Sequence, residues 1–407
     1  MSSVLKGVRV VEGSAFIAAP MAGMSLAQLG ADVIRFDQIG GGIDYNRMPR
    51  AKNNGSSLYW TGLNKGKRSF AVDLKNPQGR ELIQQLITQP GEQAGIFLTN
   101  FAGVKWLTYD ALTERRKDLI KIEISGNYDG STAVDYTVNC AVGFPFVTGP
   151  ASRDKPVNHV LPAWDVACSL QAALGVTSAL MYRQQSGLGQ EVKLALSDMA
   201  LSVVGSLGHI AEAQINGEQR PVNGNFVHGA FGRDFGTRDG RRISAMAISD
   251  KQWQVLCKAC GLTEKMQQLQ SIMELNFNID EHRYQARGSI AEFFERWCQQ
   301  HTLEEIRQIF DAHGVCWDVY QSFTELVADD PRCSEKNPMF HTVEQPGVGS
   351  HLIASSPLNF SEMERGAANP APVIGQHTDE ILADVIGLSS VEIGKLHDAG
   401  IVAGAPL

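Results

Sequence analysis

The feature that most constrains the fold is an alternation of strand-like and helix-like segments through the first half of the chain. They occupy residues 6–12 (strand), 21–29 (helix), 31–37 (strand), 78–87 (helix), 94–99 (strand) and 119–124 (strand). Because parallel strands need a crossover between them, this alternation predicts a parallel sheet with helices on both faces. We therefore expect an α/β fold with a Rossmann-like large domain.

The character of the sequence changes after residue 216. Residues 217–240 are rich in Gly, Asn and Arg, which predicts a long functional loop or a crossing between domains. Residues 241–319 indicate a smaller α+β domain, in which Ser/Thr-x-x-Glu capping boxes at 289–292 and 302–305 predict two helix starts. The expected division is a large domain at 1–216, a linker with the small domain at 217–330, and a return to the large domain at 331–407 with a last helix near 378–386.

Composition and motifs exclude several classes of function. A net charge of -8 gives no sign of non-specific binding to nucleic acid or to an anionic membrane. Neither a signal peptide nor an apolar run long enough to span a bilayer is visible, so we expect a cytoplasmic protein. The turn at residues 13–20 lacks the G-x-G-x-x-G fingerprint, so we expect no nicotinamide or flavin.

The seven cysteines are odd in number and scattered, which argues against a disulfide framework. Cys257 and Cys260 form a C-x-x-C pair, but no second pair or nearby His completes a zinc site. We therefore expect buried helix cysteines and no metal. The basic pair Lys67 and Arg68 predicts either a solvated surface turn or a phosphate contact.

An aspartate stands where the longest helical pattern begins. Apolar residues with helical spacing follow Asp165, and Gly187 and Gly189 end the pattern. Small residues along it, such as Ala172 and Ala179, predict close packing against another backbone. The simplest interpretation of Asp165 is a helix N-cap. The alternative is a carboxylate nucleophile, partly shielded from water, that attacks a thioester without a general base.

Several different short motifs follow one another along the chain. They are residues 5–11 (LKGVRVV), 29–34 (LGADVI), 64–69 (NKGKRS) with 73–75 (DLK), 100–101 (NF), 187–190 (GLGQ) and 375–380 (GQHTDE). In this order and spacing the chain resembles the class III (family III) CoA transferases over nearly its whole length. The resemblance implies a Rossmann-like domain built from both chain ends, an inserted small domain and an interlinked homodimer.

The resemblance also assigns roles to residues. It places Asp165 on the family's catalytic aspartate, which implies CoA transfer through an aspartyl mixed anhydride and an aspartyl-CoA thioester. The implied substrate is an acyl-CoA, with no cofactor beyond the CoA that the substrate carries. Positions implied for CoA are Ala15, Phe16 and Ile17 (backbone contacts), Lys67, Arg68 and Lys75 (phosphates), and Asn100 and Phe101 (pantetheine). Candidates for binding the substrate carboxylate or the oxyanion are Arg47, His228, Gly229, Gly232 and Arg233.

Further motifs at residues 12–16, 35–37, 40–42, 159–165 and 229–235 are most similar to family members that move CoA within one dicarboxylyl-CoA molecule. An intermolecular transferase that passes CoA to a free dicarboxylate would use Asp165 identically and is the main alternative. Acyl-CoA racemases use a Gly-His-Asp segment, but this chain has Ala133, Val134 and Asp135 there, so the histidine base is missing. A non-catalytic acyl-CoA-binding protein and a Rossmann oxidoreductase are the alternatives outside the transferases.

Overall fold

The computed structural model describes residues 3–150, 152, 155–363 and 365–405. The chain forms two compact units. The large unit comprises Met1–Val142, Val160–Asn216 and Pro331–Leu407, and the small unit comprises Gly143–His159 and Gly217–Asp330. The predicted large domain ran unbroken to residue 216, whereas residues 143–159 belong to the small unit.

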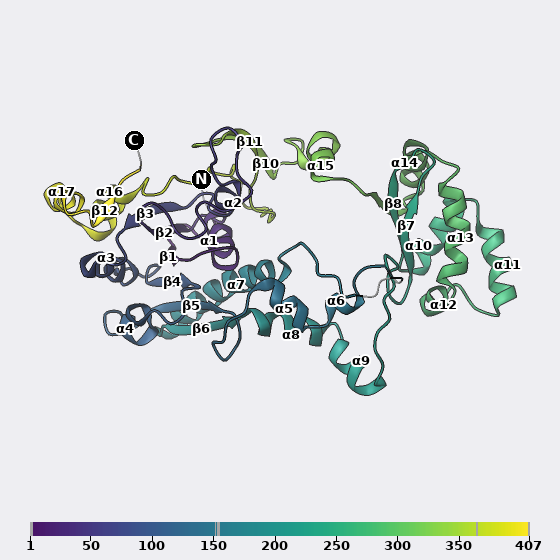
Figure 1. Cartoon of the computed structure of the whole chain (residues 1–407), viewed down its shortest axis with the longest axis horizontal. Coiled ribbons are helices and arrows are strands. Elements are labelled where there is room, and N and C mark those ends of the chain that lie inside the picture. The colour runs from purple at the N-terminus through teal and green to yellow at the C-terminus, as the bar shows by residue number, and fades with distance from the viewer. Residues whose placement is uncertain (1–2, 151, 153–154, 364, 406–407) are drawn as a thin grey trace. The chain divides into compact units, whose positions relative to one another are not determined.

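A seven-stranded sheet forms the centre of the large unit, in the order β12-β3-β2-β1-β4-β5-β6 (Figure 1). All neighbouring strands are parallel except β12, which runs antiparallel to β3. The strands are β1 (Arg9–Gly13), β2 (Asp32–Gln38), β3 (Arg68–Val72), β4 (Ile96–Thr99), β5 (Ile120–Ser125), β6 (Gln190–Ala195) and β12 (Val402–Ala403). The predicted parallel sheet is confirmed.

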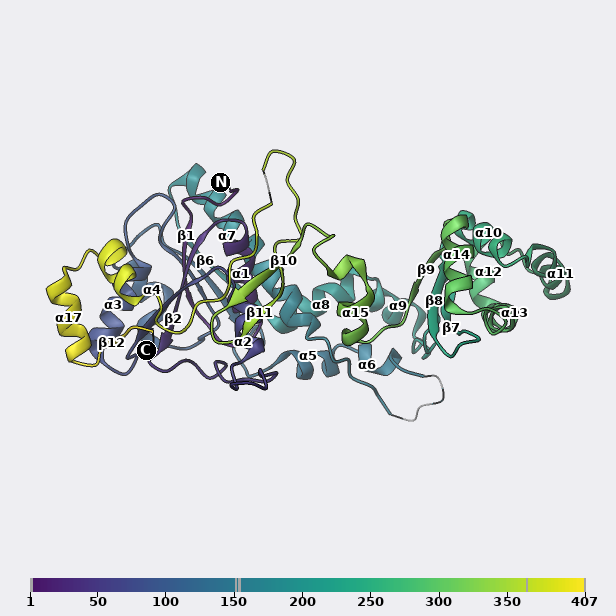
Figure 2. The same ribbon diagram turned by 90° about the horizontal axis from the view of Figure 1, so that it is seen from above.

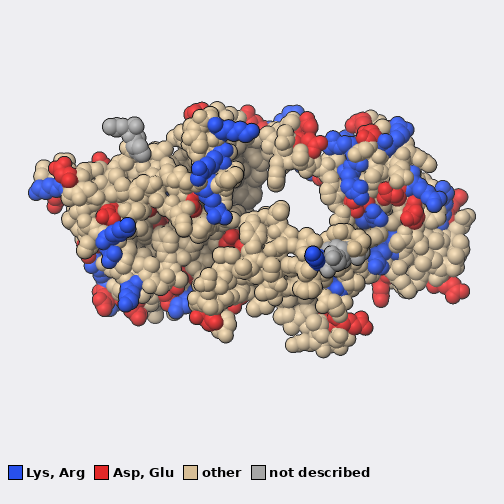
Figure 3. Space-filling view, viewed as in Figure 1, with Lys and Arg blue, Asp and Glu red and all other residues tan. Residues whose placement is uncertain are grey.

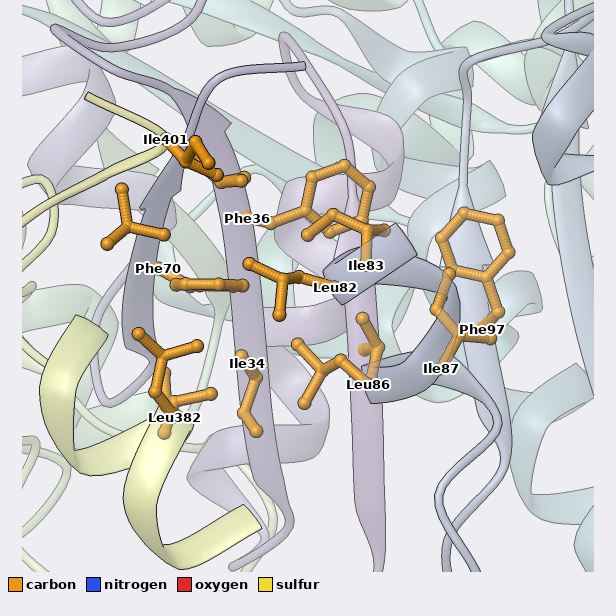
Figure 4. Packing of buried hydrophobic residues seen from close by; sticks show 14 of the residues in the cluster. Ile34, Phe36, Phe70, Leu82, Ile83, Leu86, Ile87, Phe97, Leu382 and Ile401 are labelled. Carbon is orange, nitrogen blue, oxygen red and sulfur yellow. The ribbon is translucent and has the colours of Figure 1, made fainter. Parts of the chain in front are cut away.

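Both faces of this sheet are covered, which explains why its strands read as continuous apolar runs. The side chains of Phe36, Phe70 and Phe97 on one face are almost fully buried. Leu82 and Leu86 of α3 (Pro77–Ile87) pack against them in one cluster (Figure 4). The strands and this helix therefore build a common hydrophobic core.

Two helices rich in small residues pack against each other in the large unit. They are α1 (Ala18–Gln28) and α7 (Ala163–Ser186), and the buried face of α7 includes Ala172 and Ala179. This confirms the predicted close approach of α7 to another backbone. The remaining helices before the small unit's main segment are α2 (Leu58–Leu63), α4 (Tyr109–Thr113), α5 (Asp135–Ala141), α8 (Leu196–Ser206) and α9 (His209–Asn216), with a 3-10 turn at Lys105–Leu107.

The last segment of the large unit adds a hairpin and returns to the sheet. Strands β10 (Phe340–Gln345) and β11 (Gly349–Ala354) pair antiparallel (Figure 2). The predicted last helix is present as α16 (Thr378–Glu380) and a π-helical turn, Ile381–Ile386. A further helix, α17 (Ser390–Asp398), follows it before β12 and was not predicted. The 3-10 turn Pro331–Cys333 begins this segment.

The small unit is an α+β structure around a three-stranded antiparallel sheet, β7-β8-β9. Strand β7 lies inside the stretch that was predicted to be a long loop. Cys257 and Cys260 are buried, as predicted, and burial raises the pKa of Cys257 to about 12. The elements are α6 (Phe144–Val147), β7 (Phe231–Gly236), β8 (Arg242–Ala247), α10 (Asp250–Ala259), α11 (Thr263–Met273), α12 (Asp280–Gln285), α13 (Arg287–Cys298), α14 (Leu303–His313), β9 (Cys316–Val319) and α15 (Phe323–Asp329).

The two predicted capping boxes of the small unit have different outcomes. Thr302 caps α14 reciprocally with Glu305, as predicted. Ser289 lies inside α13, which begins at Arg287, so the other box is wrong. On the visible face of the small unit, basic and acidic side chains intermingle (Figure 3). Across the described ranges, none of the helices is both long and apolar enough to cross a bilayer.

Candidate active site

The strand order of the sheet identifies where a ligand binds in a fold of this kind. The order turns from descending to ascending at β1 and β4, which is a topological switch point. In open α/β sheets, ligands bind outside the carboxyl ends of the strands at such a point. Helix α7 ends just before the amino end of β6, so its own start lies on the side where the parallel strands end.

Asp165 is the third residue of α7, in the first helical turn. The N-cap position is Pro162, so the interpretation of Asp165 as an N-cap is wrong. The side chain is half-buried. Within the described residues, its carboxylate oxygens have neither a hydrogen-bond donor nor a cationic partner. A carboxylate in such a position is unusual, because buried charges are normally paired.

A second carboxylate, Asp135 at the start of α5, takes over the capping of α7. Its Oδ2 accepts hydrogen bonds from the backbone N–H groups of Trp164 (2.6 Å) and Asp165 (3.0 Å). Its Oδ1 is buried and has no hydrogen-bond partner in the described part of the chain. The Trp164 indole donates to Asn139 Oδ1 at 3.2 Å. The backbone that carries Asp165 is therefore fixed by α5.

The environment of Asp165 disfavours its ionised form. Burial raises the pKa of Asp165 to about 7, and the negative charge of Asp135 adds to this rise. The positive end of α7 favours the ionised carboxylate, but the two opposing effects are larger. A carboxylate with a pKa near neutrality is more basic than an ordinary aspartate. It is a stronger nucleophile when it is ionised.

The loop after β1 is tied to the loop after β4 at the switch point. Asn100 Oδ1 accepts from the Ala15 N–H at 2.9 Å, and Asn100 Nδ2 donates to the Ala15 carbonyl at 2.7 Å. Phe16 has a φ of 67°, which an L-residue rarely adopts. Its N–H donates to Asp44 Oδ2 at 3.0 Å. Ile17 follows as the N-cap residue of α1. Ala15, Phe16 and Asn100, all predicted site residues, thus lie together.

A buried ionic network supports this loop. The Arg35 guanidinium donates to both carboxylate oxygens of Asp37 (2.9 and 3.0 Å), to Asp44 Oδ1 (3.1 Å) and to Asn64 Oδ1 (3.1 Å). Asp44 in turn receives the Phe16 N–H. The side chains of Arg35 and Asp44 are each about 1% exposed. Burial and these carboxylates act on the pKa of Arg35 in opposite directions, and the net effect is a rise.

The structure gives Lys67 a different role from the predicted one. Its ammonium is fully buried and donates three hydrogen bonds of 2.8 Å, to Glu12 Oε1, the Pro20 carbonyl and Asn64 Oδ1. All three N–H groups are therefore used, and Lys67 is neither a surface residue nor a phosphate ligand in this geometry. Burial lowers the pKa of Lys67 to about 8, although Glu12 opposes the shift.

The other predicted CoA contacts differ in their availability. Arg68 is held by Asp32 (2.6 Å) and Glu380 (3.0 Å), so its charge is already paired. Lys75 is exposed; its backbone N–H donates to Asp73 Oδ1, and its side chain forms no ion pair with the described residues. Phe101 lies just after β4, and its ring packs edge-on against Phe36. Lys75 and Phe101 are therefore better placed than Arg68 to contact a ligand.

Arg47 and Tyr59 form a cluster with Phe16 that the sequence did not reveal. The Arg47 guanidinium carbon lies 5.2 Å from the centre of the Phe16 ring and 5.5 Å from that of the Tyr59 ring. Burial raises the pKa of Tyr59 to about 12; the charge of Asp165 adds to this rise, and Arg47 opposes it. The charges of Arg47 and Asp165 therefore both influence this phenol, in opposite directions.

The remaining predicted residues belong to the small unit. Gly232 lies in β7, where a Cβ would come 2.9 Å from the backbone Cα of Met246, so the position favours glycine. Gly229 precedes the strand with a φ of 76°. The His228 ring packs edge-on against Tyr284 at 5.0 Å. Arg233 lies within 3.9 Å of Glu295 Oε2 and 3.7 Å of Asp234 Oδ1. These residues are near one another in sequence, and their relation to Asp165 stays a prediction.

Comparison with known sequences gives matches along nearly the whole chain. The CoA-transferase family III profile matches residues 5–378. The chain is 52% identical over 404 residues to 2-methylfumaryl-CoA isomerase of Chloroflexus aurantiacus, covering 99% of both chains. It is 26% identical to human succinyl-CoA:glutarate CoA-transferase, covering 98% of this chain and 90% of that protein. It is also 26% identical to succinyl-CoA–D-citramalate CoA-transferase of C. aurantiacus, with 96% of each covered.

Solved structures show the same fold at lower identity. A CAIB/BAIF family protein from Brucella suis has a TM-score of 0.77 at 22% identity, covering 95% of this chain and all of that one. A Mycobacterium tuberculosis protein has a TM-score of 0.74 at 22% identity, with 93% and 98% covered. The predicted α/β architecture is therefore confirmed by proteins of known structure.

Proposed function

Because this chain belongs to CoA-transferase family III, we propose that it moves CoA between the two carboxyl groups of 2-methylfumaryl-CoA to give 3-methylfumaryl-CoA. The observation that carries this proposal is the half-buried Asp165 carboxylate at the start of α7, which has no hydrogen-bond or ionic partner among the residues that the structure describes. The choice of substrate rests on the 52% identity to 2-methylfumaryl-CoA isomerase.

In the first half of the reaction, CoA passes to the enzyme. An Asp165 oxygen attacks the thioester carbonyl, and CoA thiolate leaves as the mixed anhydride forms. The thiolate then attacks the aspartyl carbonyl carbon of this anhydride. The C–O bond on the aspartyl side breaks, which leaves an aspartyl-CoA thioester and free 2-methylfumarate.

In the second half, the diacid turns within the site and the steps run in reverse. Its other carboxylate attacks the aspartyl thioester, and CoA thiolate leaves again. The thiolate attacks the new acyl carbon, which releases 3-methylfumaryl-CoA and restores Asp165. No net proton is transferred, so the reaction needs no general base. This agrees with the missing histidine beside Asp135, which a racemase would require.

The protein's contribution is position and environment. Asp135 fixes the backbone of Asp165, and burial keeps the carboxylate poorly solvated and therefore nucleophilic. For CoA, we propose contacts from the loop Ala15 to Ile17 and from Asn100 and Phe101, because these residues meet at the switch point. We propose the exposed Lys75 for the phosphates.

An intermolecular transferase is the second candidate, because two of the relatives carry names of that class and Asp165 would act identically. Intramolecular transfer gains from holding the diacid beside the enzyme-bound CoA, where effective molarities reach about 10⁵ M or more. The two candidates differ in whether the diacid leaves the site between the two halves.

One experiment separates them. The purified protein is incubated with 2-methylfumaryl-CoA alone, and then with labelled free 2-methylfumarate. Isomerisation without an added acceptor and without incorporation of label supports the proposal. Formation of labelled product at the rate of isomerisation supports intermolecular transfer, and turnover only with an added acceptor refutes isomerisation.

We also propose that the protein acts as a homodimer. Leu170, Leu174 and Met181 on α7 are each more than half exposed, and Leu201 on α8 is 49% exposed. Apolar side chains gathered on one helix face are typical of an interaction surface. Sedimentation that gives the mass of one chain at micromolar concentration would contradict the dimer.

A further inference from the structure

We propose that Arg47, held between Phe16 and Tyr59, binds the free carboxylate of the acyl-CoA and thereby selects dicarboxylyl substrates. This inference rests on the proposed function and deepens it. It identifies what distinguishes a dicarboxylyl group from a simple acyl group, and what keeps the released diacid beside Asp165.

The Arg47 guanidinium is positioned by aromatic rings. It lies over the Phe16 and Tyr59 rings at 5.2 and 5.5 Å, and in the described part of the chain it makes no ion pair with a carboxylate. Two rings orient a guanidinium but leave its in-plane N–H groups free, because cation–π contacts use the faces of the rings. A carboxylate is the partner that matches this planar pair of donors.

The backbone under Arg47 is also fixed. The Arg47 N–H donates to the Asp44 carbonyl at 3.1 Å, and the Arg47 carbonyl accepts from Ser57 Oγ at 2.6 Å. The side chain of Asp44 is itself held by Arg35 and by the Phe16 N–H. The arginine and one of its two rings are therefore anchored to the same buried residue, Asp44, the arginine through the backbone carbonyl and the Phe16 loop through the carboxylate. Preorganisation of this kind reduces the entropy that binding must overcome.

The location of the cluster fits this role. Phe16 belongs to the loop at the switch point, the Arg47 guanidinium lies 5.5 Å from the centre of the Tyr59 ring, and the charges of both Arg47 and Asp165 act on the pKa of Tyr59. Burial raises the pKa of Tyr59 to about 12, so its phenol keeps its proton at neutral pH and Arg47 is the cation of this cluster.

Three other basic residues that the sequence named as site candidates are already engaged. Lys67 uses its three N–H groups inside the protein, and Arg68 is paired with two carboxylates. Arg233 in the small unit lies near Asp234 and Glu295. Of the two arginines that the sequence nominated for the substrate carboxylate, Arg233 lies near acids, whereas Arg47 forms no ion pair with an acid among the described residues.

The test compares two ligands that differ only in the free carboxylate. They are 2-methylfumaryl-CoA and 2-methylbut-2-enoyl-CoA, in which a methyl group replaces that carboxylate. Binding is measured in an Asp165→Ala background, where neither compound can react. We expect a preference of about 30-fold for the dicarboxylyl compound, as for one charge-assisted pair. Arg47→Gln should remove that preference by weakening only the dicarboxylyl compound, and Arg47→Lys should restore part of it.

Arg50→Gln is the matched control. Arg50 is an exposed arginine of the same loop whose side chain donates to the Asn46 carbonyl, and its replacement should leave the preference intact. If Arg47→Gln weakens the binding of both compounds equally, Arg47 has only a structural role. If the variant keeps the preference for the dicarboxylyl compound, another group binds the free carboxylate. Either result overturns the inference. Because this binding needs no reaction, its failure is distinct from that of the proposed function, which fails if wild-type protein leaves Asp165 unmodified.

Discussion

Two regions at the carboxyl edge of the large unit's sheet differ in whether their buried charges have partners of opposite charge. Beneath the loop after β1, the charges of Arg35, Lys67 and Glu12 are matched by close partners at 2.8 to 3.8 Å. At the start of α7, the half-buried Asp165 forms no ion pair among the described residues, and the charge of another carboxylate, Asp135, adds to the rise of its pKa that burial causes. Paired charges in a low-dielectric interior fix a structure, whereas an unpaired carboxylate raises the free energy of the fold and marks a reactive site.

Removal of the unpaired carboxylate should have the largest effect on activity. Asp165→Ala removes the nucleophile, so we expect isomerisation to fall by at least about 10⁴-fold. The measurement is kcat with 2-methylfumaryl-CoA, with circular dichroism as a control for folding. A folded variant that retains a tenth of the activity would show that the unpaired carboxylate of Asp165 is not the reactive group.

A break in the paired region should instead affect stability. Lys67→Met removes the 2.8 Å ammonium partner of the buried Glu12 and leaves it only the Arg35 guanidinium at 3.8 Å among the ion pairs of the described residues, so we expect the free energy of unfolding to fall by about 3 kcal/mol. Denaturant titration measures this. The control is Arg115→Met, which breaks a more exposed pair with Glu81 and should cost less than about 1 kcal/mol. Equal losses in the two variants would show that the buried network has no special role.

Neutralisation of the unpaired carboxylate should stabilise the protein. The pKa of Asp165 is raised from an ordinary value near 3.8 to about 7, so the folded state holds a proton that the unfolded state has lost between these pH values. Stability therefore falls as pH rises from 4 to 7. Asp165→Asn removes this loss of stability. For this half-buried group we expect the free energy of unfolding of the variant to exceed that of the wild type by about 1 to 2 kcal/mol at pH 8, and to equal it at pH 4. If the variant were stabilised equally at both pH values, the ionisation of Asp165 would not be the cause of the stabilisation.

The smallest expected change concerns Asp135. Asp135→Asn keeps an oxygen to cap α7 but removes the charge that raises the pKa of Asp165. We expect the rise of kcat/KM with pH, centred near pH 7 in the wild type, to move to lower pH by up to about one unit. Activity at pH 6 should then increase relative to activity at pH 8. A uniform loss at every pH would show that Asp135 acts only through structure.

The sequence was sufficient to predict the fold because the determinants of the parallel sheet are local. Runs of six or seven residues rich in apolar side chains marked β1, β2, β4 and β5, and Gly187 marked the end of α7. The strand β7 was missed because the Gly and Asn residues around Phe231 dominate its local composition. Its strand character comes from pairing with β8.

For the site, the sequence identified Asp165 but not its surroundings. Lys67 was recognised as a charge, yet its partner Glu12 lies 55 residues away, so burial was not visible in the local pattern. Asp135 was noted only for the histidine missing beside it, and Tyr59 was not noted at all. Both gain their importance from contacts that form only when β1, α5 and α7 come together in the folded chain.

The most direct test of the account is to find CoA or the acyl group on Asp165 during turnover. The protein is mixed with 2-methylfumaryl-CoA, quenched with hydroxylamine or borohydride, digested and analysed by mass spectrometry. We expect the peptide that contains Asp165 to carry a hydroxamate or a reduced side chain at that residue, and only when substrate is present. An unmodified Asp165 in a sample that is actively isomerising its substrate would contradict the account.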